Sequence, residues 1–452
     1  MTSLSAPGRR PRPPRRSDIP AAPPARRLAG TGAVFGAILD HGPVARSTVA
    51  RLTGLSPASV TGHVAQLLAR GLVRESAETA GPRGLGRPHI PVEIDTGRYL
   101  VAGAHIAVAH STVSLMDLRG RIVAEDRQPH RTTDPRRMLG GLAARLTRPA
   151  AVHAGGRTVL ALGLATGHRV DPVAGVIVEH PQLGWRDVPA RDILAAATGL
   201  PVHVDSHSRA LARAEQLFGE ESTRTSTVLL FVGAVVDAAF ATEGAMHRGP
   251  RSGAGSVAHL PLGTAESGGD ADGAGGGRCS CGRTDCLQSE VSERAMVRRA
   301  AGQGLAVNSF PELLDLALAG EPRAVALFRR RARLVGRAAA LLLDMFDPEV
   351  LVVVEPGVGR MPECLAGLRA EVAKRSWVCE DPERAVVPTS FTGTVLATAG
   401  GAVALGALYT DPLGPWPALP AVSWRPANSG SRFLRRLSSG SCIVDRARMR
   451  TG

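Results

Sequence analysis

Three cysteines and one histidine are the side chains in this 452-residue chain best suited to holding a metal ion. Cys279, Cys281 and Cys286 fall within eight residues of one another, and His259 precedes them by twenty. Three thiolates and one imidazole complete a tetrahedral zinc site and leave no coordination position for a reacting water. We therefore predict a structural zinc ion bound by these four side chains. The alternative is three free thiols beside an unrelated histidine.

The remaining cysteines and the single lysine exclude several chemistries. Cys364, Cys379 and Cys442 are scattered, which is typical of inert thiols rather than of a disulfide framework. Lys374 does not follow a glycine-rich turn, so the sequence contains no Gly-x-x-x-x-Gly-Lys phosphate loop. Aromatic residues make up 3% of the chain, too few for the stacking platforms of single-strand binders.

A second pattern, between residues 46 and 70, is typical of a helix-turn-helix. Gly54 supplies a sharp turn, Ser56 suits the N-cap of the second helix, and Pro57 suits its first position. Apolar residues recur at helical spacing along that helix, at Val60, Val64, Leu67 and Leu68. The opposite face is then free to enter a DNA major groove. We predict DNA contacts from Ser56, Ser59, Thr61 and His63.

A strand–loop–strand pattern follows over residues 71–94, and its Gly/Pro-rich tip carries Arg83 and Arg87. This pattern indicates a β-wing, whose arginines would contact phosphates or a minor groove. Residues 30–95 have a net charge of only +1, so DNA affinity would depend on the wing and on the arginine-rich N-terminal tail. The alternative is a small helical domain that binds another protein.

Beyond residue 96, apolar runs alternate with helical stretches, which is typical of an α/β fold. The apolar runs occupy 99–108, 111–116, 159–164, 228–236 and 349–354, and the helical stretches include 138–146 and 322–346. The uncharged run 385–410 has few large apolar side chains, which favours a buried packing helix over a membrane span. With no secretory signal in view, we expect a cytoplasmic protein without membrane contact.

The formal charge of +14 is concentrated at the two ends of the chain. Residues 1–29 and 412–452 each carry a net charge of +6. Both segments are rich in Pro and Arg without hydrophobic periodicity, so we expect disordered tails. Codon bias is one source of so many arginines, and the total charge by itself therefore does not identify a nucleic-acid binder.

The order of these motifs resembles the ROK family (repressors, open reading frames and sugar kinases), in particular its winged-helix regulators, over roughly residues 30–412. The family's knuckle, Cys-x-Cys-Gly-x-x-Gly-Cys-x-Glu after Gly-Glu-x-Gly-His, is matched by Cys279, Cys281, Gly282, Cys286 and His259. The resemblance implies an actin-like, two-lobed sugar-kinase fold with a cleft between the lobes. It also implies a homodimer or a higher homo-oligomer.

The kinase motifs of that family are altered in this chain. The Asp-x-Gly-x-Thr phosphate turn corresponds to residues 103–108, where the Asp and the Gly are both absent, and a Cβ there blocks a close approach of phosphate. The second phosphate turn ends on Asp237, a negative charge, and the catalytic Asp corresponds to His207. Phosphoryl transfer depends on positioning and charge stabilisation, so we predict that the chain is not an enzyme. The alternative is a sugar kinase with an appended helical domain.

Sugar recognition is altered as well, because Ser256 and Gln288 stand where the family has glutamates. Carboxylates hold sugar hydroxyls through strong hydrogen bonds, so we expect weaker or different ligand binding. The candidate effector contacts are Trp185, Asp205, His207 and Gln288. The alternatives are that these residues simply line the cleft, and that the regulator has no small-molecule ligand.

Together these features predict a sequence-specific DNA-binding transcriptional regulator, a repressor with a zinc-stabilised, inactive sugar-kinase-like body that senses a sugar or sugar phosphate. The predicted domains are a tail (1–29), a winged helix-turn-helix (30–95), the effector and dimerisation body (96–411) and a second tail (412–452). Two recognition helices in a dimer lie one DNA turn or a multiple of it apart, which predicts a pseudo-palindromic operator.

Overall fold

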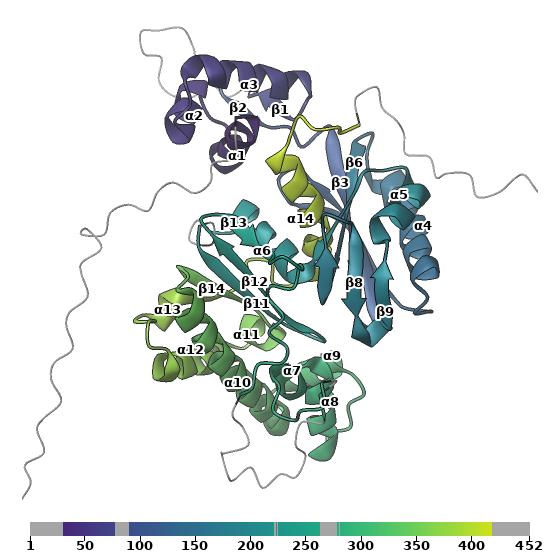
Figure 1. Ribbon diagram of the computed structural model, residues 1–452, viewed down its shortest axis with the longest axis vertical. Helices are drawn as coiled ribbons and strands as arrows, with labels where there is room; N and C mark the ends of the chain where they lie inside the picture. The colour runs from purple at the N-terminus through teal and green to yellow at the C-terminus, as the bar shows by residue number, and fades with distance from the viewer. Residues whose placement is uncertain are drawn as a thin grey trace, which may run out of the picture.

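This computed structural model describes residues 30–76, 90–220, 223, 225–262, 278–279 and 281–417. The N-terminal tail, most of the C-terminal tail and the wing residues Arg83 and Arg87 lie outside the described residues. Figure 1 shows a small helical unit at one end, a first α/β lobe beside it and a second α/β lobe beyond. The predicted α/β class of the body is confirmed by its two five-stranded sheets.

Three helices and a short antiparallel sheet make up the helical unit: α1 (Thr31–His41), α2 (Arg46–Thr53), α3 (Pro57–Ala69), β1 (Val73–Glu75) and β2 (Val92–Ile94). α2 ends at Gly54, whose φ of 68° suits a residue without a side chain. α3 begins after Ser56, whose Oγ accepts a hydrogen bond from the Ser59 backbone N–H at 3.1 Å. Pro57 lies in the first turn, where no backbone donor is needed.

The first lobe is built on a sheet with the strand order β10-β6-β3-β4-β5. The strands are β3 (Tyr99–Ile106), β4 (His110–Asp117), β5 (Ile122–Pro129), β6 (Thr158–Thr166) and β10 (Val202–Ser206). β3 is buried along its whole length, which explains a continuous rather than an alternating apolar sequence. The lobe also contains α4 (Pro135–His153), α5 (Ala190–Thr198) and the antiparallel strands β7 (Arg169–Asp171), β8 (Val176–His180) and β9 (Trp185–Val188).

The second lobe has a sheet with the order β13-β12-β11-β14-β15. Its strands are β11 (Thr227–Val232), β12 (Val236–Thr242), β13 (Ala245–His247), β14 (Val350–Val354) and β15 (Val386–Pro388). Its helices are α7 (Leu287–Val291), α8 (Glu293–Gly302), α9 (Phe310–Leu318), α10 (Pro322–Phe346), α11 (Pro356–Arg360), α12 (Pro362–Arg375) and α13 (Pro382–Ala385). α6 (His207–Phe218) follows β10 and contacts strands of both lobes.

The helix α14 (Val395–Thr410) returns the chain to the first lobe and packs on β3 and β6. Glycines permit this close approach: a Cβ on Gly163 would lie 2.1 Å from the carbonyl oxygen of Gly400. The second part of the uncharged run 385–410 thus forms the buried packing helix that we expected, whereas the first part contains β15 (Val386–Pro388). Among the described residues, no helix combines the length and the apolar content that a membrane crossing requires.

One hydrophobic core joins the helical unit to the first lobe. Phe35 of α1 stacks on Tyr409 of α14 with ring centroids 4.4 Å apart, and the Tyr409 hydroxyl donates a hydrogen bond to the Leu118 carbonyl at 2.8 Å. Buried residues of the helical unit, such as Ile38, belong to the same cluster as Val101 and others of the lobe. Packing is therefore continuous across the predicted boundary between residues 95 and 96.

The predicted and observed elements of the body agree in type and differ mainly at their ends. The stretch 322–346 is α10, and 138–146 lies inside the longer α4. The apolar run 228–236 does not form one strand: β11 ends at Val232 and β12 begins at Val236. The chain reverses at Gly233, whose N–H donates to the Val235 carbonyl at 3.0 Å, so that the two strands pair antiparallel.

Candidate functional site

The outer face of α3 carries the residues predicted to contact DNA. Ser56, Ser59 and Thr61 are exposed, whereas Val60 and Val64 on the same helix are buried. The hydroxyls also stabilise the helix: the Ser56 and Ser59 Oγ atoms lie 2.9 Å apart, and Thr61 donates to the Pro57 carbonyl at 2.8 Å. Each hydroxyl oxygen keeps acceptor capacity for a further partner. The helix thus presents a short, nearly uncharged polar surface.

His63 differs from the other three predicted contacts. Its Nδ1 lies 2.9 Å from the Thr31 hydroxyl at the start of α1, and its side chain is partly buried. A Cβ on Gly30 would come within 3.0 Å of the His63 ring. The structure therefore places this imidazole between α3 and α1. Gly62 beside it is exposed, and a Cβ added there would have nothing within 4 Å.

The four predicted metal ligands are brought together. One ligand atom from each of His259, Cys279, Cys281 and Cys286 can be chosen so that all lie within 4.8 Å of one another. The Cys279 Sγ is 3.3 Å from His259 Nδ1, and the Cys281 and Cys286 Sγ atoms are also 3.3 Å apart. Tetrahedral Zn–S bonds of about 2.3 Å would place two sulfur atoms roughly 3.8 Å apart, so a small outward movement of these thiols admits the ion. The donor set and its spacing thus fit a tetrahedral dication such as zinc.

Backbone hydrogen bonds shape the loop that carries these cysteines. The Cys279 N–H donates to the Arg283 carbonyl, and the Gly282 N–H donates to the Cys279 carbonyl, both at 2.8 Å. Gly282 has a φ of 87°, which favours glycine at this turn. Hydrogen bonding, chiefly from the Arg283 backbone, lowers the pKa of the Cys281 thiol to about 6, while burial raises the pKa of Cys286 to about 12. One thiolate therefore forms readily to receive a cation.

The cysteine loop also fixes Gln288, one of the candidate effector contacts. The Gln288 backbone N–H donates to the Ala258 carbonyl, which adjoins His259. Its side-chain amide spans the β11–β12 turn: Oε1 accepts from the Val236 N–H and Nε2 donates to the Ala234 carbonyl, both at 2.8 Å. Gln288 thus connects the predicted metal centre to the β11–β12 turn.

His207 lies at the start of α6, buried between the two lobes. Its Nδ1 is 3.4 Å from Nε2 of His105, and its Nε2 is 3.3 Å from the Asp237 carboxylate, although the N–H direction misses that oxygen. Phe231 covers the ring at 4.0 Å between centroids. Burial alone would raise the pKa of Asp237, but the His207 side chain and the His168 backbone N–H outweigh it and lower that pKa. A paired carboxylate therefore occupies this part of the cleft.

Two further histidines extend the group, which we call the histidine cluster: His105, His168, His180 and His207. The His168 and His180 rings meet edge to face at 4.9 Å, and His168 also pairs with the Gln182 amide. His180 is fully buried, and neither of its ring nitrogens has a hydrogen-bond partner among the described residues. Burial, followed by the charge of neighbouring His168, lowers the pKa of His180 to about 3. Sequence reasoning identified only His207, because the other three come from separate strands or turns.

The other candidate effector contacts lie apart from one another. The Trp185 indole is buried and donates to the Thr133 carbonyl at 2.6 Å, with its ring 6.3 Å from that of His180. Asp205 forms an ion pair with Arg209 at 2.6 Å and lines a cavity that is not lined by Trp185, His207 or Gln288. The four residues therefore do not converge on a single ligand position.

Comparison with known proteins agrees with this geometry. Residues 101–408 match the ROK family. The transcriptional regulator Rv0485 of Mycobacterium tuberculosis H37Rv is 33% identical over 412 residues, which cover 87% of this chain and 89% of that protein. The DNA-binding transcriptional dual regulator NagC of Escherichia coli K12 is 24% identical over 340 residues, 72% of this chain and 79% of NagC.

Two solved structures share the fold. A ROK family transcriptional regulator, a homologue of the E. coli MLC protein, has a TM-score of 0.69 at 20% identity and covers 85% of this chain and 97% of its own. A ROK family glucokinase from Streptomyces griseus, in complex with glucose and AMPPNP, has a TM-score of 0.56 at 21% identity. The match covers 67% of this chain and 98% of the glucokinase chain. The body thus has the sugar-kinase-like α/β fold. This chain belongs to the ROK family, on the branch of its transcriptional regulators.

Proposed function

We propose that this chain is a DNA-binding repressor whose helical unit is a winged helix-turn-helix. The carrying observation is α3, a capped helix after a three-residue turn, with buried Val60 and Val64 on one face and exposed Ser59, Thr61 and Gly62 on the other. A helix held in this way can enter a major groove and contact base edges through its N-terminal half. Arg83 and Arg87 remain predicted contacts of the wing.

The helical unit would use few charges for DNA binding. Hydroxyls such as those of Ser59 and Thr61 accept from or donate to several base edges, so each gives modest discrimination. Affinity would then come from arginines outside α3 and from the pairing of two subunits on a pseudo-palindromic operator. A chain with the N-terminal 29 residues removed should show a shallower dependence of affinity on salt.

The body would hold zinc as a structural element. His259, Cys279, Cys281 and Cys286 would bind the ion and close the loop from which Gln288 reaches the β11–β12 turn. Bound zinc supplies folding free energy to a loop that has little apolar core of its own. This chain's residues contribute the donor atoms and the backbone bonds that keep them together.

The body would respond to a ligand without transferring phosphate. A protein of E. coli O157:H7 that is 24% identical to this chain bears the name N-acetylglucosamine repressor. This name suggests a sugar or sugar phosphate as the effector class. In this chain the buried Asp237 faces His207 beside the β11–β12 turn, which we matched in sequence to the second phosphate turn of the family kinases. A phosphate there would meet a negative charge. A regulator without a small-molecule ligand is the alternative for this part of the proposal.

Selection of genomic DNA fragments by the purified full chain tests the DNA-binding role. We expect enrichment of a few fragments that share a pseudo-palindromic sequence, with footprints spaced by whole DNA turns. Absence of any bound DNA at low salt would refute the role, because even non-specific affinity increases as salt falls.

Phosphoryl transfer from ATP to a panel of hexoses tests the kinase alternative. The proposal expects no turnover above a protein-free control. Turnover that disappears in a His207→Ala variant would instead establish a kinase with an appended helical domain, since His207 stands at the position of the catalytic base.

A further inference from the structure

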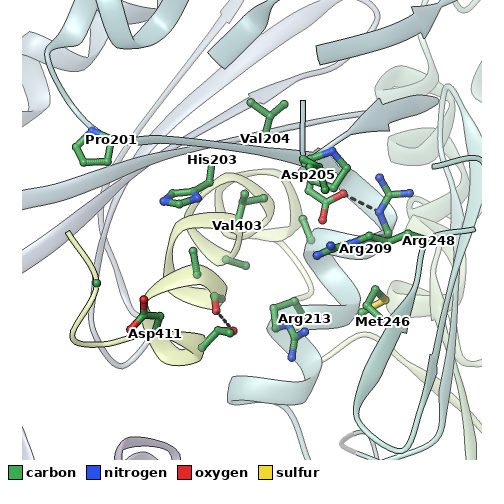
Figure 2. Close-up of a pocket in the computed structure, with 18 of the residues that line it drawn as sticks. Pro201, His203, Val204, Asp205, Arg209, Arg213, Met246, Arg248, Val403 and Asp411 are labelled. Atoms are coloured by element: carbon green, nitrogen blue, oxygen red, sulfur yellow. Dashed lines mark hydrogen bonds and ion pairs between the residues drawn. The ribbon is translucent and has the colours of Figure 1, made fainter. Parts of the chain in front are cut away.

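A cavity lies on the side of α6 that faces α14. It has a volume of about 440 Å³ and is lined by β10, α6, β13, α14 and the turn that follows α14. None of its lining residues is His105, His168, His180, His207 or Asp237. Figure 2 shows Arg213, Met246 and Arg248 along one side, with His203 and Asp411 across from them. Cavities of roughly 300–1,000 Å³ are the usual size for small-molecule sites.

Two arginines face this cavity without a hydrogen-bonding or ion-pair partner among the described residues: Arg213 from α6 and Arg248 beyond β13. The third, Arg209, is already neutralised by Asp205 at 2.6 Å and donates to the Val170 carbonyl at 2.8 Å. Burial, and next the charge of Arg248, lowers the pKa of Arg213. Two guanidinium groups that repel each other across one cavity are stabilised by an anion between them.

The rest of the wall is mainly apolar and aromatic, and it also includes Thr410 and Asp411. Val403 and Ala407 of α14 and Met246 of β13 line it, and Trp416 closes one end, with its ring 5.6 Å from that of His203. Gly406 leaves room for Arg213, because a Cβ there would lie 2.9 Å from the Arg213 Cγ. A suitable ligand therefore has an anionic head for the guanidinium groups and an apolar body for α14 and Trp416.

The turn after α14 also contacts the end of the helix that we propose reads DNA. Arg70, the C-cap of α3, donates from its guanidinium to the Leu413 carbonyl at 3.1 Å. Trp416 in the same turn donates from its indole to the Asp411 carbonyl at 2.7 Å. A molecule that displaces Trp416 would move the carbonyl groups to which Arg70 is bound. The cavity and α3 are thus joined by one short turn.

We propose that this cavity is a regulatory site for a small organic anion, a carboxylate or phosphate ester with an apolar body, and that its occupancy shifts α3 through residues 411–416. The binding of the anion stands by itself, while the effect on DNA rests on the proposed function. Linkage then requires that DNA and the anion change each other's affinity by the same factor.

The test uses the full chain with three probes of one shape: phenyl phosphate, benzoate and neutral benzyl alcohol. Calorimetry and tryptophan fluorescence should give a dissociation constant below about 1 mM for at least one of the two anions and no binding of the alcohol. The tighter anion identifies the head group. Arg248→Gln, at an exposed position where the exchange should leave folding intact, should weaken that anion about tenfold, as should Arg213→Gln.

Arg251→Gln is the matched control, because Arg251 is exposed and does not line the cavity. It changes the net charge equally and should leave anion binding unaltered. Trp416→Phe should keep the heat of binding and lose most of the fluorescence change. Absence of binding by both anions up to about 10 mM, or equal weakening by Arg251→Gln, would overturn the site.

The effect on DNA is tested by measuring the affinity of the full chain for an enriched operator fragment, with and without the bound anion. We expect a change of at least about threefold in operator affinity in the original chain and none in Arg70→Gln, which should still bind the anion. If the chain binds no DNA but binds the anion, the proposed function fails and the site stands. If the chain binds DNA but neither anion, the proposed anion site is refuted and the proposed function stands.

Discussion

At the scale of single residues, the cysteine loop offers the most direct test of metal binding. We expect about one zinc ion per purified chain, because four donor atoms lie within 4.8 Å of one another. Cys281→Ser should lose most of that zinc, since a serine hydroxyl is a poor ligand in a thiolate site. The measurement is elemental analysis after gel filtration.

Cys379→Ser provides the comparison for this prediction. Cys379 is partly buried in a different part of the second lobe, and burial raises the pKa of its thiol. It should retain the full zinc content. Equal zinc in the Cys281→Ser variant and the original chain would show that the four residues do not hold the ion.

His180 predicts how stability depends on pH. Its pKa is about 3 in the folded chain because it is buried, against 6.5 when unfolded, so protonation favours the unfolded state. The contribution of His180 to the free energy of unfolding is constant above pH 6.5. As the pH falls from 6.5 towards 3, this residue destabilises the folded chain progressively. Between pH 7 and 5 the free energy of unfolding should fall by about 2 kcal/mol from this residue.

Denaturant unfolding at about pH 7 and about pH 5 measures this effect. His180→Leu should reduce the loss between the two pH values, whereas His247→Leu, at an exposed position on β13, should leave it unchanged. Other histidines with lowered pKa, including His110 at about 4, act in the same direction and account for what remains. An identical loss in His180→Leu would contradict the assignment.

At the scale of elements, α3 can be tested with one glycine on each of two helices. Gly62→Glu places a carboxylate on the exposed face of α3, where a Cβ has nothing within 4 Å. It should weaken operator binding more than about tenfold, because the added charge repels DNA phosphates. Gly36→Glu on α1, where a Cβ also meets nothing within 4 Å, is the matched control.

Fluorescence anisotropy with a labelled operator, at one fixed salt concentration, gives both affinities. The operator affinity of Gly36→Glu should stay within about threefold of that of the original chain, because α1 packs on the body and does not lie on the side proposed to face the groove. Similar losses in both variants would mean that the charge acts at long range and that α3 is not the reading helix.

The local elements were predictable because their signals are local. α10 shows helical periodicity along 25 residues, Gly54 and Ser56 mark one turn and one cap, and the cysteines lie close in sequence. The histidine cluster was not predictable in the same way. His105 pairs with Ala165 across β3 and β6, and His180 ends β8, so only the sheet register brings these rings together. Arg213 and Arg248 likewise come to line one cavity only in the folded chain.

At the scale of the whole molecule, the shared core predicts that the helical unit and the first lobe unfold together. Phe35 is fully buried against Tyr409, and Phe35→Ala should cost about 3–5 kcal/mol through lost burial and a cavity. All four tryptophans lie after residue 184, so the helical unit contains no tryptophan of its own. Phe35→Ala should nevertheless lower the melting temperature seen by tryptophan.

Trp377→Ala is the comparison for this substitution, because Trp377 is 77% exposed. It should change the melting temperature little. If far-ultraviolet circular dichroism of Phe35→Ala showed an early helical transition while the tryptophan signal kept its original midpoint, the two parts would be independent folding units.

The Phe35–Tyr409 contact also limits how such a protein can be recombined. Replacing the helical unit before residue 96 with another DNA-binding domain would leave the Tyr409 ring and its neighbours uncovered, as an apolar patch exposed to water. A functional chimera would have to carry a matching aromatic residue on its first helix, or exchange the end of α14 together with the head. Changes of DNA specificity in this chain are therefore more readily made by replacing surface residues of α3 than by exchanging whole domains.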